Sequence, residues 1–258
     1  PITSFFSAPL SHSYVLQQAL ADTLTIFSSC HHPLIWAGHE IARFGLSAPL
    51  LNFAEKHQIP IVSSLLGKTV IDEHHPLFVG VYQGKMSSDQ TLETIEKCDC
   101  LLNAGVVLSD IDTGIFSVKL DQNHRIIASR DVTTIANHQY PIQLADYIKG
   151  LNTLSLSPPF SLPFTARHST LPDSFTPEKG TRITIKRLFQ CIQNHLNENS
   201  IVISDVGDSL FASADLALSQ NAFFSNSYFA SIGAGTPMAI GAQFADPKRR
   251  VIAIVGDG

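Results

Sequence analysis

Two short acidic stretches, each following a run of apolar residues, contain the side chains best suited to chemistry. Asp208 lies in SDVGDS (204–209) after IVI, and Asp257 lies in the terminal GDG (256–258) after VIAIV. Parallel sheets bind ligands outside the carboxyl ends of their strands, so both carboxylates are expected there. Mg²⁺ is commonly held by one or two carboxylates plus phosphate oxygens, and the glycines beside Asp257 allow close approach to a diphosphate. The alternative, an ordinary Asp-Gly turn, is the commoner use of this pair.

A second candidate stretch, 232–238, contains a Gly-x-Gly pair but no third glycine at dinucleotide-binding spacing. The first predicted domain also lacks a glycine-rich phosphate-binding fingerprint after any strand, so we expect no bound NAD. The small residues of this stretch and of the helix after it favour close helix packing instead; they are Gly233, Gly235, Ala239, Gly241 and Ala242.

The elements that must position these residues alternate along the chain. Apolar residues recur at helical spacing in 14–29, 46–58, 87–99 and 140–151, and short apolar runs typical of buried strands lie at 33–38, 59–64, 100–110 and 125–131. This alternation predicts an α/β fold with a doubly wound parallel sheet over residues 1–151.

Residues 152–180 contain five prolines and no sustained period, which predicts an interdomain linker. A second α/β unit follows at 181–258, with helices expected in 181–200 and 232–245 and strands at 201–205 and 251–255. A sheet that stopped at residue 255 would leave an edge that a complete domain covers. We therefore expect the chain to be one whole domain plus the front of a truncated second one.

The composition excludes several classes of protein. The 258 residues are 44% hydrophobic and 15% charged, with a net charge of −5 and no dense block of Lys and Arg, so nucleic acid is not an expected partner. No apolar run approaches the ~20 residues that span a bilayer, and the N-terminus lacks the features of a signal peptide. Cys98 and Cys100 have no matching pair at zinc spacing, which favours reduced thiols in a cytoplasmic protein.

Several longer segments carry a family resemblance. DPKRRVIAIVGDG (246–258) resembles the start of the thiamine diphosphate fingerprint. VISDVGDSLF, YFASIGAGTPMAIGAQFA, GKTVIDEHHPLFVGVYQG and LLNAGVVLSDIDTGIFS each resemble segments of 2-oxo acid decarboxylases, with pyruvate, indolepyruvate and phenylpyruvate decarboxylases the most similar. The resemblance runs in order over nearly the whole chain.

The resemblance implies a thiamine-diphosphate- and Mg²⁺-dependent carboxy-lyase that converts a 2-oxo acid to an aldehyde and CO₂. Residues 1–151 would be the central domain and 181–258 the start of the diphosphate-binding domain. The pyrimidine-binding domain and the second half of the metal site would lie outside this chain, so the chain alone is expected to be inactive. The complete protein is expected to be a homodimer or homotetramer.

The same resemblance assigns roles to individual residues. Asp257 would bind Mg²⁺, with Gly256 and Gly258 along the diphosphate, and the cofactor contacts would include Val206, Asp208, Ser209 and Ser231. The carbonyl of Ala230 would accept a hydrogen bond from the cofactor's 4′-amino group. Ile232 would hold the cofactor in its V shape, and its alternative is an ordinary core isoleucine.

Ile111, Leu210 and Phe211 would line the substrate pocket. Because aliphatic side chains leave more room than rings, a bulky 2-oxo acid is the expected substrate, such as phenylpyruvate, indolepyruvate or a branched-chain oxo acid. Two other functions stay open. An enzyme like acetolactate synthase or benzoylformate decarboxylase would also use thiamine diphosphate, and bound flavin would mark the synthase. A non-catalytic binding module would show no saturable cofactor binding.

Overall fold

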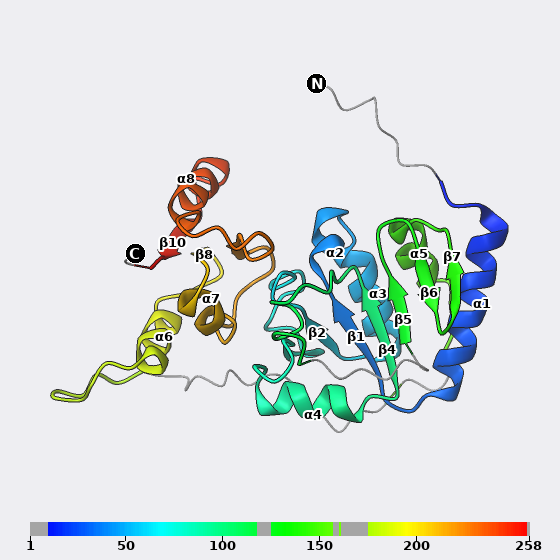
Figure 1. Ribbon diagram of the computed structural model, residues 1–258, viewed down its shortest axis with the longest axis horizontal. Coiled ribbons are helices and arrows are strands. Elements are labelled where there is room, and N and C mark those ends of the chain that lie inside the picture. The colour runs from blue at the N-terminus through cyan, green and yellow to red at the C-terminus, as the bar shows by residue number, and fades with distance from the viewer. Residues whose placement is uncertain (1–9, 118–124, 157–159, 161–174, 257–258) are drawn as a thin grey trace.

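The computed structural model describes residues 10–117, 125–156, 160 and 175–256 (Figure 1). These residues form a seven-stranded sheet of order β3-β2-β1-β4-β5-β6-β7 and a three-stranded sheet of order β10-β8-β9. The strands of the first sheet are β1 (Pro33–Ala37), β2 (Ile61–Ser63), β3 (Phe78–Val81), β4 (Cys100–Ala104), β5 (Arg125–Ala128), β6 (Thr133–Ile135) and β7 (His138–Tyr140). Its helices are α1 (Ser13–Ser29), α2 (His39–Arg43), α3 (Ser47–His57), α4 (Asp89–Lys97) and α5 (Leu144–Leu151).

The first sheet confirms the predicted α/β class but is mixed. Strands β1 to β5 pair in parallel, whereas β5 with β6 and β6 with β7 pair antiparallel. A parallel neighbour needs a crossover of about a dozen residues, but only residues 136 and 137 separate β6 from β7. Ala136 has φ 50°, a left-handed conformation that suits this tight turn. The sheet is thus mostly parallel, as predicted, with an antiparallel hairpin at this edge that the sequence did not reveal.

Alternate residues of the buried strands face opposite layers, as the pleat requires. Ile35 and Ala37 of β1 contribute to the core shared with α1, α3 and α5. Leu34 and Trp36 face the other way, into a cluster that contains Ile95 of α4. Helices therefore cover both faces, and the doubly wound arrangement is confirmed.

The three-stranded sheet and the helices around it form the smaller part of the described chain. Its elements are α6 (Ile185–Asn194), β8 (Ser200–Ser204), α7 (Asp208–Ser213), β9 (Phe223–Ser225), α8 (Gly235–Ala245) and β10 (Arg250–Ile254). Both pairings are parallel, and the central strand β8 is buried along its whole length. Val202 of β8 packs with Phe189 of α6 and Leu210 of α7, while α8 packs against β8 and β10.

Three helices begin later than their periodicity predicts, and the one expected in 181–200 is α6, which begins at Ile185 and ends at Asn194. The expected helix 140–151 begins at Leu144, because Tyr140 belongs to β7 and Gln143 is extended with ψ 136°. The expected helix 232–245 begins at Gly235, because Gly233 has φ 81°, which a right-handed helix does not allow. No helix in the described part of the chain has the length and apolar character needed to span a bilayer.

Candidate functional site

The carboxyl ends of β8 and β10 lie side by side. Ser204 is the ladder partner of Ile254, and the backbone N–H of Asp205 donates to the carbonyl of Ile254 at 2.9 Å. The stretch 204–209 and the residues after β10 therefore start from neighbouring points on one sheet edge, as predicted from their position after two strands.

Asp205 joins a third segment to this edge. Its side chain is buried, with 7% of the residue exposed, and each carboxylate oxygen accepts a backbone hydrogen bond. Oδ2 accepts from the N–H of Gly233 at 2.9 Å, and Oδ1 accepts from the N–H of Val206 at 3.0 Å. One carboxylate thus holds the loop before α8 against the end of β8.

Gly235, the first residue of α8, completes the contact. A Cβ at this position would lie 3.0 Å from Cγ1 of Val255 and 3.2 Å from Cβ of Asp205. The close packing predicted for this stretch is therefore confirmed at Gly235. The prediction of close packing is wrong for Gly241, where a Cβ would meet no atom within 4 Å. At Gly233 glycine is favoured by the left-handed backbone φ and not by close packing.

The turn between β8 and α7 depends on Gly207. Its φ of 94° and ψ of −150° fall in a region that only glycine populates readily, and the space where a Cβ would stand is open. The hydroxyl of Ser209 donates to the carbonyl of Asp205 at 2.8 Å, which fixes the turn. Asp208 is exposed at the first position of α7. Its carboxylate and the backbone at Gly207 therefore both face open space.

The loop that carries Ala230, Ser231 and Ile232 is exposed. Ile232 has 80% of its surface accessible, so it packs into neither core of the described residues. Ala230 has φ 56°, and its N–H donates to the carbonyl of Asn226 at 2.8 Å. A left-handed alanine costs about 1–2 kcal/mol relative to the ordinary helical region, so this turn holds strain.

The predicted metal site falls mainly outside the described residues, because Asp257 and Gly258 both lie there. Gly256 is described; it is exposed and follows the end of β10. Within the described ranges, no group of three His, Cys, Asp or Glu side chains could hold a metal ion. The Mg²⁺ assignment therefore stays a prediction.

The three predicted pocket residues meet in one apolar cluster. Ile111, from the loop after β4, packs partly buried against the cluster of Leu210, and so does Phe211. Leu210 itself is 1% exposed, so it lies behind the surface of this wall. The structure thus brings together a side chain of the loop after β4 and two of α7, about 100 positions apart in sequence.

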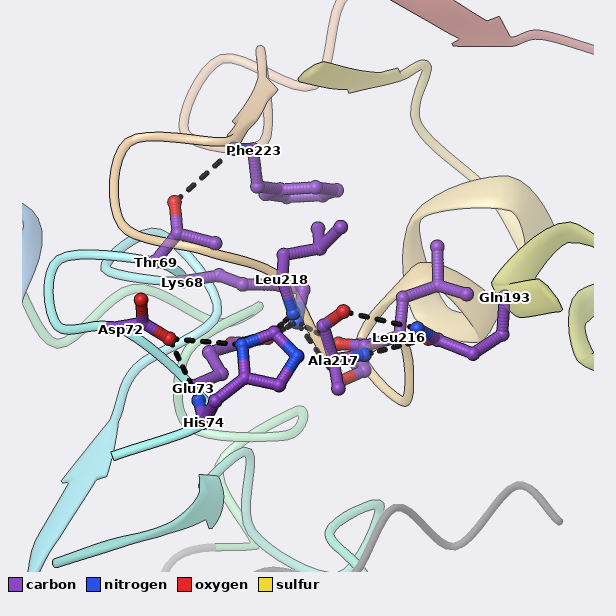
Figure 2. Close-up of polar contacts among 11 residues, drawn as sticks. Lys68, Thr69, Asp72, Glu73, His74, Gln193, Leu216, Ala217, Leu218 and Phe223 are labelled. Carbon is purple, nitrogen blue, oxygen red and sulfur yellow. Dashed lines mark hydrogen bonds and ion pairs between the residues drawn. The ribbon is translucent and has the colours of Figure 1, made fainter. Parts of the chain in front are cut away.

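Figure 2 shows the polar junction that holds the two parts of the chain together. Lys68 and Glu73 follow β2, and both side chains are fully buried, with Nζ 2.8 and 2.7 Å from the two carboxylate oxygens. Nζ also donates to the carbonyl of Leu216 at 2.7 Å, and Glu73 accepts from the N–H of Leu218 at 3.0 Å. A buried ion pair with these extra hydrogen bonds meets the condition that makes such pairs tolerable.

A second buried charge, Asp112, lies directly after Ile111. Its Oδ1 accepts from the N–H of Leu66 at 2.9 Å, while Oδ2 has no hydrogen-bond partner among the described residues. Burial raises the pKa of this carboxyl to about 6, against the opposing effect of hydrogen bonds from the Leu66 backbone, the Ser64 side chain and the Leu65 backbone. Asp112 therefore anchors the loop that carries Ile111, and its carboxyl loses its proton at a higher pH than an ordinary aspartate does.

Comparison with known proteins agrees with this geometry. Residues 20–149 match the family model described as thiamine pyrophosphate enzyme, central domain, and residues 205–258 match the thiamine pyrophosphate enzyme C-terminal TPP binding domain. The chain belongs to the thiamine pyrophosphate enzyme family. The second match begins at Asp205, the residue that joins the three segments.

Curated relatives in this family include decarboxylases. The chain is 30% identical over 249 residues to a pyruvate decarboxylase of Candida glabrata, covering 93% of the chain and 44% of the relative. It is 29% identical over 254 residues to pyruvate decarboxylase isozyme 1 of Saccharomyces cerevisiae, with 94% and 44% covered. It is 28% identical over 202 residues to an alpha-keto-acid decarboxylase of Mycobacterium ulcerans, with 78% and 36% covered. The chain thus spans less than half the length of these relatives.

Sequence reasoning does not find two features of the site. It selects Asp208 and not Asp205, although an acidic residue directly after a buried strand is an available signal. The Lys68–Glu73 pair carries no such signal, because i, i+5 spacing in a loop is typical of solvated charges and its burial depends on residues 214–218.

Proposed function

We propose that the full-length protein containing this chain is a thiamine-diphosphate- and Mg²⁺-dependent 2-oxo acid decarboxylase that releases an aldehyde and CO₂. The observation that carries the proposal is the convergence of three segments, 204–209, 230–235 and 254–256, around Asp205. These are the segments that the family resemblance assigns to the cofactor. When bound, thiamine diphosphate supplies the electron sink that accepts the electrons of the broken C–C bond.

The chain's own residues would bind and orient that cofactor. The open backbone at Gly207 and the exposed residues Asp208 and Gly256 give the diphosphate and metal a place to approach. The exposed Ile232 is suited to press on a ligand, because its side chain has no competing contacts in a core. The carbonyl of Ala230 would accept the hydrogen bond that orients the amino group, and Asp257 would hold Mg²⁺.

The test is steady-state turnover of the full-length protein with and without thiamine diphosphate and Mg²⁺. We expect aldehyde and CO₂ in equal amounts only when both are present. The variant Ile232→Ala should lower kcat without changing the melting midpoint, because its side chain is 80% exposed. Ile183→Ala is a matched control, since Ile183 is also 80% exposed but lies before α6. Cofactor-independent turnover, or equal effects of the two substitutions, would contradict the proposal.

We further propose that the preferred substrate is bulky, such as phenylpyruvate, indolepyruvate or a branched-chain oxo acid. The support is the apolar cluster in which Ile111, Leu210 and Phe211 meet, with aliphatic side chains at two of its three predicted pocket positions. An apolar pocket discriminates by about 1–3 kcal/mol per methylene-sized change, or roughly 10–200-fold.

The measurement is kcat/KM of the full-length protein on phenylpyruvate and on pyruvate. We expect phenylpyruvate to be preferred, and Ile111→Phe to reduce that preference by at least about tenfold. Leu108→Phe is the control, because Leu108 lies in the same loop but is 47% exposed. A clear preference of the unmodified protein for pyruvate would overturn the substrate proposal and leave the decarboxylase proposal standing.

We also propose that the full-length protein is a homodimer or homotetramer, as the family resemblance implies. Light scattering after size-exclusion chromatography tests this: a mass of two or four chains supports it, and a monomer contradicts it.

A further inference from the structure

A threonine in the loop after β2 has a backbone conformation that does not suit a threonine. Thr69 has φ 64°, in the left-handed region, and it is buried, with 2% of its surface exposed. A β-branched side chain at this φ strains the backbone, and a glycine would adopt it freely. The backbone therefore gives no reason for threonine at this position, whereas the contacts of its side chain do.

Thr69 binds the segment that leads into β9. Its Oγ1 accepts a hydrogen bond from the backbone N–H of Phe223 at 3.2 Å, across 154 positions of sequence (Figure 2). Its carbonyl accepts from the N–H of Asn221 at 3.0 Å. The carbonyl of Ala222, in the same peptide unit as the N–H of Phe223, accepts from the N–H of Val202 in β8 at 2.8 Å. Thr69 and β8 therefore hold one peptide unit at the start of β9 between them.

The loop that carries Thr69 is fixed on both sides of it. Before it, Gly67 packs so closely on the end of β1 that a Cβ there would lie 2.7 Å from the carbonyl oxygen of Ala37. After it, the N–H of Glu73 donates to the carbonyl of Leu218 at 3.0 Å, in addition to the buried ion pair of this residue. The first sheet therefore sets the position of Thr69, and Thr69 passes that position on to β9.

Strand β9 leads directly into the loop that would contact the cofactor. The strand ends at Ser225, and residues 226–232 follow it. At the far end of this loop, the N–H of Gly233 is held by the carboxylate of Asp205. Between these two attachments the loop carries Ala230 and Ile232, and Ile232 has 80% of its surface exposed. A shift at the start of β9 would therefore move the near end of the loop and the two residues with it.

We propose that Thr69 is a positioning residue for the cofactor loop: its hydroxyl fixes the start of β9, and through β9 it sets where Ala230 and Ile232 meet thiamine diphosphate. This inference rests on the proposed function. Thr69 acts through β9 and does not touch the cofactor itself. It lies in the part of the chain that matches the central domain, whereas the loop lies in the part that matches the TPP binding domain. The affinity for the cofactor therefore depends on a residue outside the domain that binds it.

Three substitutions of Thr69 in the full-length protein test the role of its hydroxyl. Thr69→Val keeps the branched shape but leaves the buried N–H of Phe223 without its acceptor, and we expect the affinity for thiamine diphosphate to fall by about tenfold in a calorimetric titration. Thr69→Ser keeps the hydroxyl and should keep the affinity. Thr69→Gly lacks the hydroxyl but suits the left-handed φ, so it should lose affinity as valine does while melting at a higher temperature than the valine variant. Should Thr69→Val not fold, the glycine variant carries the test.

Thr23→Val is the matched control for a purely structural effect. Thr23 is also fully buried, and its Oγ1 is hydrogen-bonded to the hydroxyl of Tyr147 at 2.7 Å, between α1 and α5. This variant should melt at a lower temperature but bind thiamine diphosphate like the unmodified protein when both are fully folded. Unchanged affinity in both Thr69→Val and Thr69→Gly, or an equal loss of affinity in Thr23→Val, would overturn the proposal.

Hydrogen exchange of the cofactor-free protein, followed by mass spectrometry, tests the positioning role without a ligand. We expect peptides that cover 223–233 to exchange faster in Thr69→Val and Thr69→Gly than in the unmodified protein, and at an unchanged rate in Thr69→Ser and Thr23→Val. If the unmodified protein binds no thiamine diphosphate, the proposed function fails, and the exchange of 223–233 alone decides whether Thr69 positions this loop. Exchange of 223–233 that no substitution of Thr69 changes would overturn the inference.

Discussion

The carboxylate of Asp205 accepts the backbone N–H of Gly233 at 2.9 Å, across 28 positions of sequence, and its own N–H donates to Ile254 on the next strand. One buried residue therefore connects the β8 turn, the loop before α8 and the end of β10. The arrangement gives Asp205 a positioning role: it holds the backbone that the cofactor would contact.

Asp205→Asn should weaken this connection. An Asn side chain offers one acceptor where Asp205 offers two, so one backbone N–H loses its partner at a cost of about 1–3 kcal/mol. We expect the affinity for thiamine diphosphate to fall by at least about tenfold in the full-length protein, measured by calorimetric titration. Asp131→Asn, at an exposed position shortly before β6, should leave that affinity unchanged. If the two variants bound thiamine diphosphate with equal affinity, Asp205 would not have the positioning role.

The buried Lys68–Glu73 pair should be essential to the junction. Lys68→Met leaves the buried carboxylate of Glu73 without its cation, and breaking such a pair typically costs about 3–5 kcal/mol. We expect denaturant unfolding to show this loss. The double variant Lys68→Met with Glu73→Leu should be less destabilised than the sum of the two single variants. Lys97→Met removes the cation of an exposed ion pair with Glu93 and should barely change the denaturant midpoint of unfolding.

Asp112 predicts a pH dependence of stability with a definite sign. Its folded-state pKa of about 6 is higher than the ordinary aspartate value near 4, so the folded protein binds the proton more tightly. Its contribution is fully present below about pH 4 and is lost as pH rises through 6. Asp112→Asn cannot ionise and keeps the acceptor for Leu66. Relative to the variant, the unmodified protein should lose up to about 3 kcal/mol of unfolding free energy between pH 4 and pH 8. A pH-independent difference would show that Asp112 has an ordinary pKa.

Ala230 should tolerate glycine better than an ordinary alanine does. Its φ of 56° strains a residue with a Cβ, so Ala230→Gly relieves strain while it keeps the backbone carbonyl. We expect thermal unfolding to show unchanged stability or a gain of about 1 kcal/mol. Ala239→Gly, inside α8, should instead lose about 1 kcal/mol. A similar loss at both positions would mean that residue 230 is not left-handed.

The sequence predicted the elements whose signal is local. Runs such as 33–37 and 201–203 are continuous apolar stretches bounded by polar or turn residues, and both lie in strands. The strand β3 and the helix α7 were not predicted, because four and six residues are too short to show a period. The β6–β7 hairpin was missed because its polar residues resemble a loop.

The candidate site, like the fold, could be predicted where the signal is local and not where it depends on residues far away in the sequence. The stretch 204–209 could be placed because it follows a recognisable strand, and the structure brings it beside the end of β10. The role of Asp205 could not be read from its neighbours, because it depends on Gly233, 28 positions away, adopting a left-handed turn. Likewise, the burial of Lys68 depends on a segment nearly 150 positions later.

The most direct test of the proposed cofactor site is a calorimetric titration of the full-length protein with thiamine diphosphate in the presence and absence of Mg²⁺, repeated with Asp257→Asn. We predict saturable binding of one cofactor per chain that requires Mg²⁺ and is lost or strongly weakened in the variant. No saturable binding, or binding that neither Mg²⁺ nor the substitution affects, would contradict the cofactor site.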